Sequence, residues 1–330
     1  MELVPLGRTN TAVTRLAFGA AGLGNLFTPV GDEEANAALA AAWTAGIRSF
    51  DTAPHYGLGL SERRLGRFLQ EHPRDGFHLS TKVGRILEPV EPVSGSDAAN
   101  GFAVPATHTR RWDFTADGIR RSLEESLTRL GVDRVDTVYL HDPDDHLDQA
   151  LGEAYPALER LRTEGLVGSI GAGMNHCEPL ARFVRDTDVD VVLIAGRYTL
   201  LDQTALQELL PAALEHDISV VIGGVFNSGL LADPHPDATF DYTTAPAPQV
   251  ERALRMQEVC ARHGVPLRAA AVRFALAHPA VASVLVGART ADEITDAGRQ
   301  YARRVPAALW VDLRTTALLP DNVPVPEGDH

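Results

Sequence analysis

The sequence predicts an α/β protein folded as a (β/α)8 barrel, and two observations carry that prediction. Short runs rich in β-branched residues alternate with longer amphipathic stretches along the 330 residues, and there are eight runs of each kind. Several short runs, such as Val189–Ala195, are almost continuously apolar, which is typical of parallel strands covered on both faces. The count of eight, without a dinucleotide-binding glycine fingerprint, favours a closed barrel over an open sheet.

The predicted strands are short, and each is followed by a predicted helix, as parallel pairing requires. The strands are Arg15–Gly19, Ile47–Thr52, Phe77–Lys82, Val135–His141, Val167–Gly171, Val189–Ala195, Ser219–Gly223 and Ala282–Gly287. The helices are Glu33–Ala45, Ser61–Leu69, Ala116–Leu130, Leu147–Thr163, Glu178–Arg185, Ala205–His216, Val250–His263 and Ala291–Arg303. Asp32 and Thr115 stand where N-cap residues are expected. Glycines that commonly end helices follow four of them: Gly46, Gly131, Gly165 and Gly264.

Three segments depart from this alternation. Residues from Leu3 to Val13, around Gly7, predict a hairpin that caps the bottom of the barrel. Long loops rich in Pro, Gly or Ser follow strands 3 and 7, at Arg85–Asp113 and Val225–Pro248. Loops of this length without a strand or helix pattern are commonly functional lids. No linker or internal repeat is present, so we expect residues 1–330 to form a single domain.

The composition narrows the function. A formal net charge of −14 argues against a nucleic-acid or anionic-membrane partner, and leaves a small molecule as the expected one. The cysteines, Cys177 and Cys260, are too few for a disulfide framework. The N-terminus has no signal-peptide pattern and no apolar run has the length of a membrane span, so a cytoplasmic location is expected. The oligomeric state is not predictable.

Polar residues that close successive apolar strands are the candidates for chemistry, because functional groups of such barrels gather at the C-terminal ends of strands. Asp51, Lys82 and His141 close the second, third and fourth strands, and Tyr56 lies in the loop after Asp51. Lys82 is the only lysine of the chain. Each residue alone has an ordinary structural explanation, but an interior lysine needs a partner. Four such residues on consecutive strand ends predict a common site.

These residue types suit proton transfer coupled to hydride transfer. A tyrosine hydroxyl, with an unperturbed pKa of about 10, is a weak acid at neutral pH. An adjacent ammonium group favours the phenolate, and a carboxylate keeps that ammonium charged and in place. A histidine can donate a hydrogen bond to the substrate oxygen. We therefore expect Lys82 to lower the pKa of Tyr56 toward its working range.

The run Asp-Thr-Ala-Pro-His-Tyr-Gly at residues 51–57, with Ser80-Thr81-Lys82 and Leu140-His141, resembles the ordered motifs of the aldo-keto reductases. The resemblance covers nearly the whole chain. It implies that Asp51, Tyr56, Lys82 and His141 are the catalytic tetrad, with Tyr56 as the general acid/base. The segments 121–127, 139–144 and 195–202 resemble the aldose 1-dehydrogenase branch, which includes L-fucose and D-threo-aldose dehydrogenases.

The resemblance also implies a nicotinamide cofactor. Asn175 fits the residue that holds the nicotinamide carboxamide, whereas Gly173 and Ala195 replace the family's serine and glutamine. Tyr198 is expected near the nicotinamide ring. The segment 223–231 resembles the loop that covers the pyrophosphate, with four residues predicted to contact the cofactor: Gly223, Asn227, Gly229 and Leu230.

Residues near the last strand bear on the choice between NAD and NADP. Gly287 and Glu293 occupy the positions of the lysine and arginine that grip the 2′-phosphate in NADP-dependent members of the family. A carboxylate repels that phosphate but can accept hydrogen bonds from a free ribose diol. We expect NAD to be preferred over NADP, although Arg289 could turn toward a phosphate.

The expected reaction is oxidation at C1 of an aldose to the lactone. Phe27, His55, Trp112 and Phe226 are the predicted walls of the substrate pocket. A pyridoxal 4-dehydrogenase or a general aldehyde or ketone reductase is the alternative. A barrel that binds nicotinamide and regulates a partner protein, like the potassium-channel β subunits, is the non-catalytic alternative. A metal-assisted enzyme would need a ligand set, and the segment 141–146, although rich in His and Asp, lacks zinc or calcium spacing. No metal is predicted.

Overall fold

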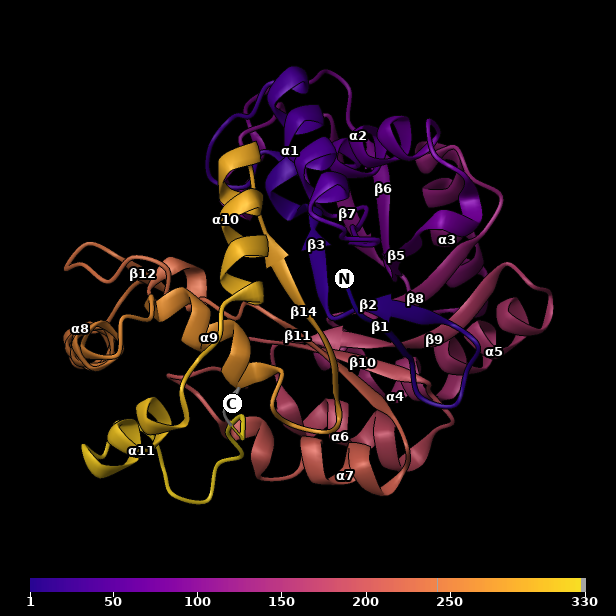
Figure 1. Cartoon of the computed structure of the whole chain (residues 1–330). Helices are drawn as coiled ribbons and strands as arrows, with labels where there is room; N and C mark the ends of the chain where they lie inside the picture. The colour runs from indigo at the N-terminus through magenta and orange to yellow at the C-terminus, as the bar shows by residue number, and fades with distance from the viewer. Residues whose placement is uncertain (242, 328–330) are drawn as a thin grey trace.

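The computed structural model describes residues 1–241 and 243–327. Eight parallel strands close into a barrel, in which each strand of the chain pairs with the next and the last returns to the first. Figure 1 shows the helices arranged around this barrel. The barrel strands are β3 (Leu16–Gly19), β4 (Ser49–Asp51), β5 (His78–Val83), β8 (Val135–His141), β9 (Val167–Met174), β10 (Val191–Ala195), β11 (Ser219–Gly223) and β14 (Val281–Gly287). The predicted fold class and all eight predicted strands are confirmed.

The helices that follow the strands were mostly predicted, with differences of at most four residues at their ends. The helices are α1 (Asp32–Thr44), α2 (Leu60–Leu69), α3 (Ala116–Leu130), α4 (Leu147–Gln149), α5 (Tyr155–Thr163), α6 (Cys177–Asp186), α7 (Leu209–Glu215), α8 (Ala247–Arg262), α9 (Leu267–Ala275), α10 (Ala291–Ala302) and α11 (Ala307–Thr315). The single helix predicted over Leu147–Thr163 is interrupted by a π turn at Ala150–Ala154. Helices α9 and α11 were not predicted.

The predicted helix ends were correct at all but one position. The Thr115 hydroxyl accepts a hydrogen bond from Gly118 N at 3.0 Å, and so caps α3. Asp32 is not an N-cap, because Gly31 takes that position. Asp32 lies in the first turn of α1, where its negative charge interacts favourably with the positive end of the helix dipole. The four predicted C-terminal glycines all have positive φ, as a left-handed residue after a helix requires: Gly46, Gly131, Gly165 and Gly264.

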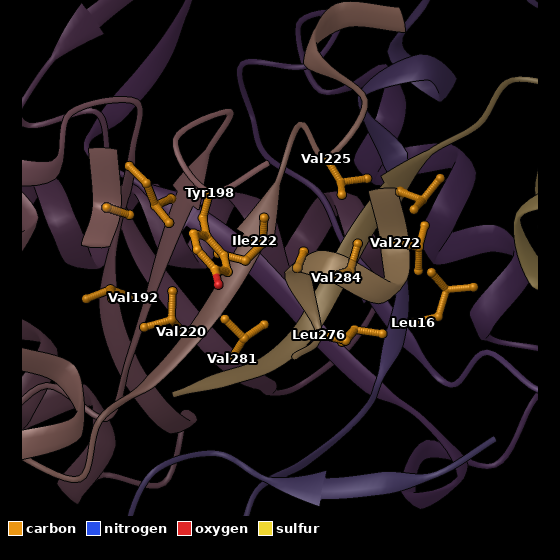
Figure 2. Close-up of a cluster of buried hydrophobic side chains, with 14 of the residues drawn as sticks. Leu16, Val192, Tyr198, Val220, Ile222, Val225, Val272, Leu276, Val281 and Val284 are labelled. Carbon is orange, nitrogen blue, oxygen red and sulfur yellow. The ribbon is translucent and has the colours of Figure 1, made fainter. Parts of the chain in front are cut away.

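Alternate strand residues face opposite sides of the barrel wall, because side chains alternate along a strand. Leu193 and Val221 belong to a small cluster inside the barrel. Their neighbours Val192 and Val220 belong to the large cluster that joins the strands to the helices. Figure 2 shows part of this outer core, to which α9 contributes Val272. Helix α11 packs apolar side chains into the same core.

The N-terminal hairpin closes the bottom of the barrel, as predicted. Strands β1 (Leu3–Pro5) and β2 (Ala12–Thr14) pair antiparallel, and Leu6 and Val13 pack into the inner cluster. Gly7 sits at the turn with φ +50°, and its N–H donates to Ser219 Oγ at 2.7 Å. A Cβ atom on Gly7 would lie 2.5 Å from Asp190 O, so only glycine fits.

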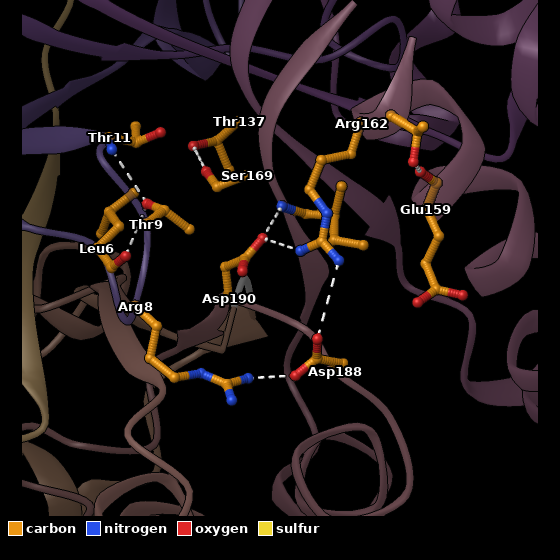
Figure 3. A network of polar contacts seen from close by, with 12 residues as sticks. Leu6, Arg8, Thr9, Thr11, Thr137, Glu159, Arg162, Ser169, Asp188 and Asp190 are labelled. Carbon is orange, nitrogen blue, oxygen red and sulfur yellow. Dashed lines mark hydrogen bonds and ion pairs between the residues drawn. The ribbon is translucent and has the colours of Figure 1, made fainter. Parts of the chain in front are cut away.

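Ion pairs tie this hairpin to the barrel (Figure 3). Arg8 pairs with Asp188, and Arg162 contacts Asp190 at 2.8 Å and Asp188 at 3.9 Å. The Asp190 carboxylate also accepts from Ile170 N at 2.9 Å, which joins β9 to the segment before β10. These contacts hold the hairpin against the N-terminal face of the barrel, at the end opposite the predicted site.

Both long loops contain secondary structure that the sequence did not predict. In the segment 85–113, strands β6 (Arg85–Pro89) and β7 (His108–Trp112) pair antiparallel with Arg85 opposite Trp112. In the segment 225–248, strands β12 (Thr239–Phe240) and β13 (Thr243–Thr244) form a short ribbon, and α8 begins at Ala247. The first ribbon rises from the C-terminal end of β5, next to the predicted site.

Candidate active site

Asp51 and Lys82 form a buried ion pair at the C-terminal rim of the barrel. Lys82 Nζ lies 2.5 Å from Asp51 Oδ2, and the two side chains are 3% and 5% exposed. Lys82 Nζ also donates to Thr52 O at 3.0 Å, and Ser80 Oγ donates to the other Asp51 oxygen at 2.8 Å. Each charged group is thus satisfied by protein atoms, as burial demands.

The register of two neighbouring strands creates this pair. Asp51 on β4 is opposite Ser80 on β5, and Lys82 lies two residues further along β5, on the same face. Burial acts to lower the pKa of Lys82, but the charges of Asp51 and Tyr56 act in the opposite direction and raise it above its ordinary value. Lys82 is therefore a permanent cation.

Tyr56 is held over this cation by a tight loop. Lys82 Nζ lies 4.8 Å from the centroid of the Tyr56 ring. The next residue, Gly57, has φ +61°, and a Cβ atom there would lie 2.2 Å from Gly24 O, so the loop depends on glycine. Gly24 meets the same loop from the other side, because a Cβ atom there would lie 2.6 Å from the carbonyl carbon of Tyr56.

The pKa of Tyr56 differs from our expectation. Burial raises it, and Lys82 lowers it by less, so the pKa stays above the ordinary tyrosine value. Asp51 and Asp142, both negative, add to the upward shift. Lys82 lowers the pKa of Tyr56, as expected, but burial of the phenol raises that pKa by more. Lys82 limits the rise.

His141 completes the group from the end of β8. Its ring centroid lies 5.9 Å from that of Tyr56 and 5.6 Å from that of His55. Burial, followed by the positive charges of Arg85 and Lys82, lowers the pKa of His141 well below its ordinary value. The ring is therefore neutral and carries a single N–H. Its Nδ1 atom has no hydrogen-bond partner among the described residues.

The predicted cofactor residues, with one exception, lie along the C-terminal rim. Asn175 follows β9, Gly223 ends β11, and Asn227 and Gly229 form the 3₁₀ turn η7 (Asn227–Gly229) just beyond. Asn227 Oδ1 is buried without a partner among the described residues, and no atom lies within 4 Å of a Cβ built on Gly229. An unused acceptor beside open backbone fits a polar ligand such as a dinucleotide. Leu230 is fully buried, so only its backbone could contribute.

Tyr198 is the exception. Its ring is fully buried in the outer core, 5.1 Å from Phe274 and 5.6 Å from His278 between centroids. Figure 2 shows it among Val192, Val220 and Ile222, which point away from the barrel interior. The structure therefore contradicts its placement near a nicotinamide ring.

The residues predicted to discriminate NAD from NADP are paired with one another. Arg289 lies 3.1 Å from Glu293 across one helical turn, and Glu293 also accepts from Arg289 N at 2.7 Å. Thr290 caps α10 by accepting from Glu293 N at 3.2 Å. Gly287, at the end of β14, is exposed. Both side chains of the pair are more than one-third exposed, so they face solvent beside this helix start.

The four residues predicted to line the substrate pocket differ in their exposure to solvent and in their neighbours. Phe27 and Trp112 are exposed, by 56% and 41%, whereas His55 is half-buried beside His141. Burial and then Arg85 lower the pKa of His55 to about 2, so this ring is neutral too. Phe226 packs mainly against the outer core.

Sequence reasoning missed three residues at this site, all on the loop after β5. Phe102 is buried with its ring centroid 5.1 Å from that of His55 and 6.1 Å from that of Tyr56. Arg110 donates to His55 O at 2.9 Å and is anchored by Asp97 at 2.5 Å. Arg85 pairs with Asp142, the residue after His141. The available signal was the presence of Arg85 and Arg110, in an acidic chain, within a loop that contains no predicted helix or strand.

Neither a metal site nor a membrane helix is present in the part of the chain that the structure describes. No group of three or more His, Cys, Asp or Glu side chains could hold a metal ion there. None of its helices is both long and apolar enough to cross a membrane.

The chain is similar to several known proteins. The sequence profile of the aldo/keto reductase family matches residues 15–308. D-threo-aldose 1-dehydrogenase of a Pseudomonas species is 49% identical over 94% of this chain and 95% of that protein. Pyridoxal 4-dehydrogenase of Microbacterium luteolum is 38% identical over 95% of this chain and 97% of that protein. In fold, an aldo-keto reductase of Bacillus halodurans, solved in its holo form, superposes with a TM-score of 0.76, at 24% identity over 97% and 96% of the two chains.

The buried ion pair gives a prediction about stability. Replacing Asp51 with asparagine leaves Lys82 buried without its counter-charge, and should lower the free energy of unfolding by about 3–5 kcal/mol. Urea denaturation at neutral pH measures the change. The control is Asp75→Asn, which removes an ion pair with Arg134 at 2.7 Å from a carboxylate that is 91% exposed, and should cost less than about 1 kcal/mol. Equal effects of the two variants would contradict the assigned importance of the buried pair.

Proposed function

The chain belongs to the aldo/keto reductase family of oxidoreductases, and on that basis we propose that it oxidises C1 of an aldose, of the D-threo or L-fucose type, to the lactone with NAD. The observation that carries this proposal is the ion pair of Asp51 and Lys82 beneath Tyr56, with a neutral His141 beside it. The 49% identity to a D-threo-aldose 1-dehydrogenase supports the substrate class. We propose further that residues 1–330 form one domain.

Each residue of the tetrad has its own role in the proposed reaction. Tyr56 takes the proton of the C1 hydroxyl, and the electron pair of the C1–H bond leaves as hydride, so that C1 and its oxygen become the lactone carbonyl. The chemistry that NAD would supply when bound by Asn175 and the segment 223–230 is acceptance of that hydride. His141 donates its one N–H to the reacting oxygen, since its lowered pKa keeps it neutral. Lys82, kept charged by Asp51, stabilises the Tyr56 phenolate.

Asn175 and the segment 223–230 are the residues that we propose hold the cofactor. The unpartnered Asn227 oxygen and the open backbone at Gly229 support this. Glu293 supports NAD over NADP, because its carboxylate stands where a 2′-phosphate would need positive charge. Arg289 is already engaged by that carboxylate.

An NAD-coupled assay of the full chain tests the proposal. D-threo aldoses and L-fucose should reduce NAD, and pyridoxal should be turned over less efficiently. Preferred turnover of pyridoxal would favour the activity named for the 38% identical relative instead. Tight nucleotide binding without turnover of any sugar, pyridoxal or simple aldehyde would favour a regulatory barrel.

The Lys82→Arg variant tests the assigned mechanism. Arginine keeps the charge, but its broad guanidinium cannot fit the position now 2.5 Å from Asp51 and 3.0 Å from Thr52 O. We expect kcat to fall by roughly 10²- to 10⁴-fold. Nucleotide binding, followed by fluorescence titration, should change little. Normal turnover by this variant would show that Lys82 has no part in proton transfer.

The raised pKa of Tyr56 predicts the pH dependence. Oxidation requires the deprotonated tyrosine, so log(kcat/KM) should climb with pH from 7 to 10 without a plateau, by about one decade per unit. Because Lys82 lowers the pKa of Tyr56, a Lys82→Met variant should shift the rise to still higher pH. Since the pKa of His141 lies well below 6.5, no second titration should appear above that value. A plateau below pH 9 in the parent enzyme would mean that another group is the base.

Glu293→Gln tests the basis of cofactor choice. The substitution removes the carboxylate and frees Arg289, so the ratio of kcat/KM for NADP to that for NAD should rise roughly fivefold or more. Asp292→Asn, one residue away in the same helical turn, removes the same charge without a contact to Arg289 and serves as the control. The proposed preference would be wrong if the parent enzyme already favoured NADP.

A further inference from the structure

An ion pair outside the tetrad lies at the rim beside His141. Arg85, the first residue of β6, contacts the carboxylate of Asp142, which directly follows β8. Their side chains are 10% and 33% exposed, so the pair is largely removed from solvent while Asp142 stays accessible. Asp142 has φ +43°, and its N–H donates to Gly173 O at 2.9 Å, which fixes the turn that aims it.

The guanidinium of Arg85 is held in one orientation. Trp112 is opposite Arg85 in the ribbon of β6 and β7, and the guanidinium carbon lies 4.2 Å from the centroid of the indole. A cation stacked on an aromatic face and paired with a carboxylate has little freedom left. Arg85 Nε is nevertheless buried without a hydrogen-bond partner among the described residues. A buried N–H donor of this kind is costly unless a ligand supplies the acceptor.

The pair faces the place where the reaction occurs. Asp142 Oδ2 lies 3.5 Å from His141 Nε2, and Arg85 acts electrostatically on Tyr56, His55 and His141. A fixed donor and a fixed acceptor therefore lie next to His141, which is the residue proposed to hold the reacting oxygen. This arrangement complements hydroxyl groups, each of which can donate to a carboxylate and accept from a guanidinium.

We propose that Arg85 and Asp142 are specificity-determining residues that recognise the hydroxyl groups on the carbons next to the reacting carbon. The inference rests on the proposed aldose oxidation, and it specifies which part of the sugar the site recognises. A substrate without those hydroxyls leaves a buried ion pair facing an apolar group, and it binds less well for that reason.

The ribbon itself supplies a matched control. Arg111 lies next to Arg110 and Trp112 on β7, but it is 43% exposed and pairs with Glu88 at 2.6 Å and Asp113 at 2.7 Å, on the side away from His141. Arg111→Met removes a ribbon arginine and two ion pairs without touching the site. Loss of ribbon stability alone should therefore appear in this variant as well.

The experiment compares Asp142→Asn, Arg85→Lys and Arg111→Met with the parent enzyme. Asparagine tolerates the positive φ of residue 142, so this variant should fold, and a thermal melt checks it. Each enzyme is assayed with an aldose it oxidises, with the matching 2-deoxy sugar, and in reverse with a short aldehyde that carries no hydroxyl. For Asp142→Asn and Arg85→Lys we expect KM for the aldose to rise roughly 10- to 100-fold with kcat changed less.

The discrimination between substrates decides the outcome. The preference for the aldose over its 2-deoxy form should shrink in both site variants, while reduction of the short aldehyde and all activities of Arg111→Met stay within about twofold of the parent. Equal losses on all three substrates would overturn the inference, because the pair would then act through His141 and not on the sugar. A parent enzyme that turned over the short aldehyde but no aldose would instead overturn the proposed function, and the inference with it.

Discussion

The site depends on the buried pair of Asp51 and Lys82. Placing two charges in a protein interior is costly, and the cost is offset only when each charge meets its partner and the remaining hydrogen-bonding capacity is satisfied. Here Thr52 O and Ser80 Oγ complete the set. Ser80 lies on β5 and Thr52 directly follows β4, so the pairing of these two strands also places the atoms that stabilise the buried charges. Strand register is thereby a determinant of chemistry as well as of shape.

The residues proposed to bind the substrate come from a different part of the chain than the tetrad. The tetrad residues Asp51, Lys82 and His141 come from strand ends, whereas Arg85, Phe102 and Trp112 come from the loop after β5. That loop is ordered by its own ribbon and by a small apolar cluster of Leu58, Leu87, Phe102 and Val104. The barrel can thus keep its proton-transfer group unchanged while the pocket is rebuilt from a separately packed unit.

The strands, and the clustering of Asp51, Tyr56, Lys82 and His141, could be predicted from sequence because each leaves a local pattern. Val189–Ala195 has few alternatives to a buried strand, and a lone interior lysine needs a carboxylate. Helix α9 was missed because it follows α8 after a four-residue turn and its run of alanines has no amphipathic period. Arg85 and Asp142 lie far apart in sequence, so only tertiary structure brings them together.

Two other expectations failed for reasons that a sequence does not contain. Tyr198 follows a strand as a site residue would, but the side of the wall that it takes depends on Gly196, whose φ of +71° turns the chain there. The pKa of Tyr56 depends on how much of the phenol is buried, and that is a property of packing. In both cases the residue type alone was not enough, because the position of Tyr198 and the pKa of Tyr56 depend on the surrounding structure.

The N-terminal hairpin has a practical consequence. It closes the barrel at the end opposite the tetrad, while Leu3 there is 61% exposed and Met1 is 39% exposed. A linker or solid support attached at this terminus meets neither the catalytic rim nor the loop that carries Arg85. Attachment at the N-terminus would thus leave the opposite rim of the barrel unobstructed, so that tethered molecules keep this rim open to solution.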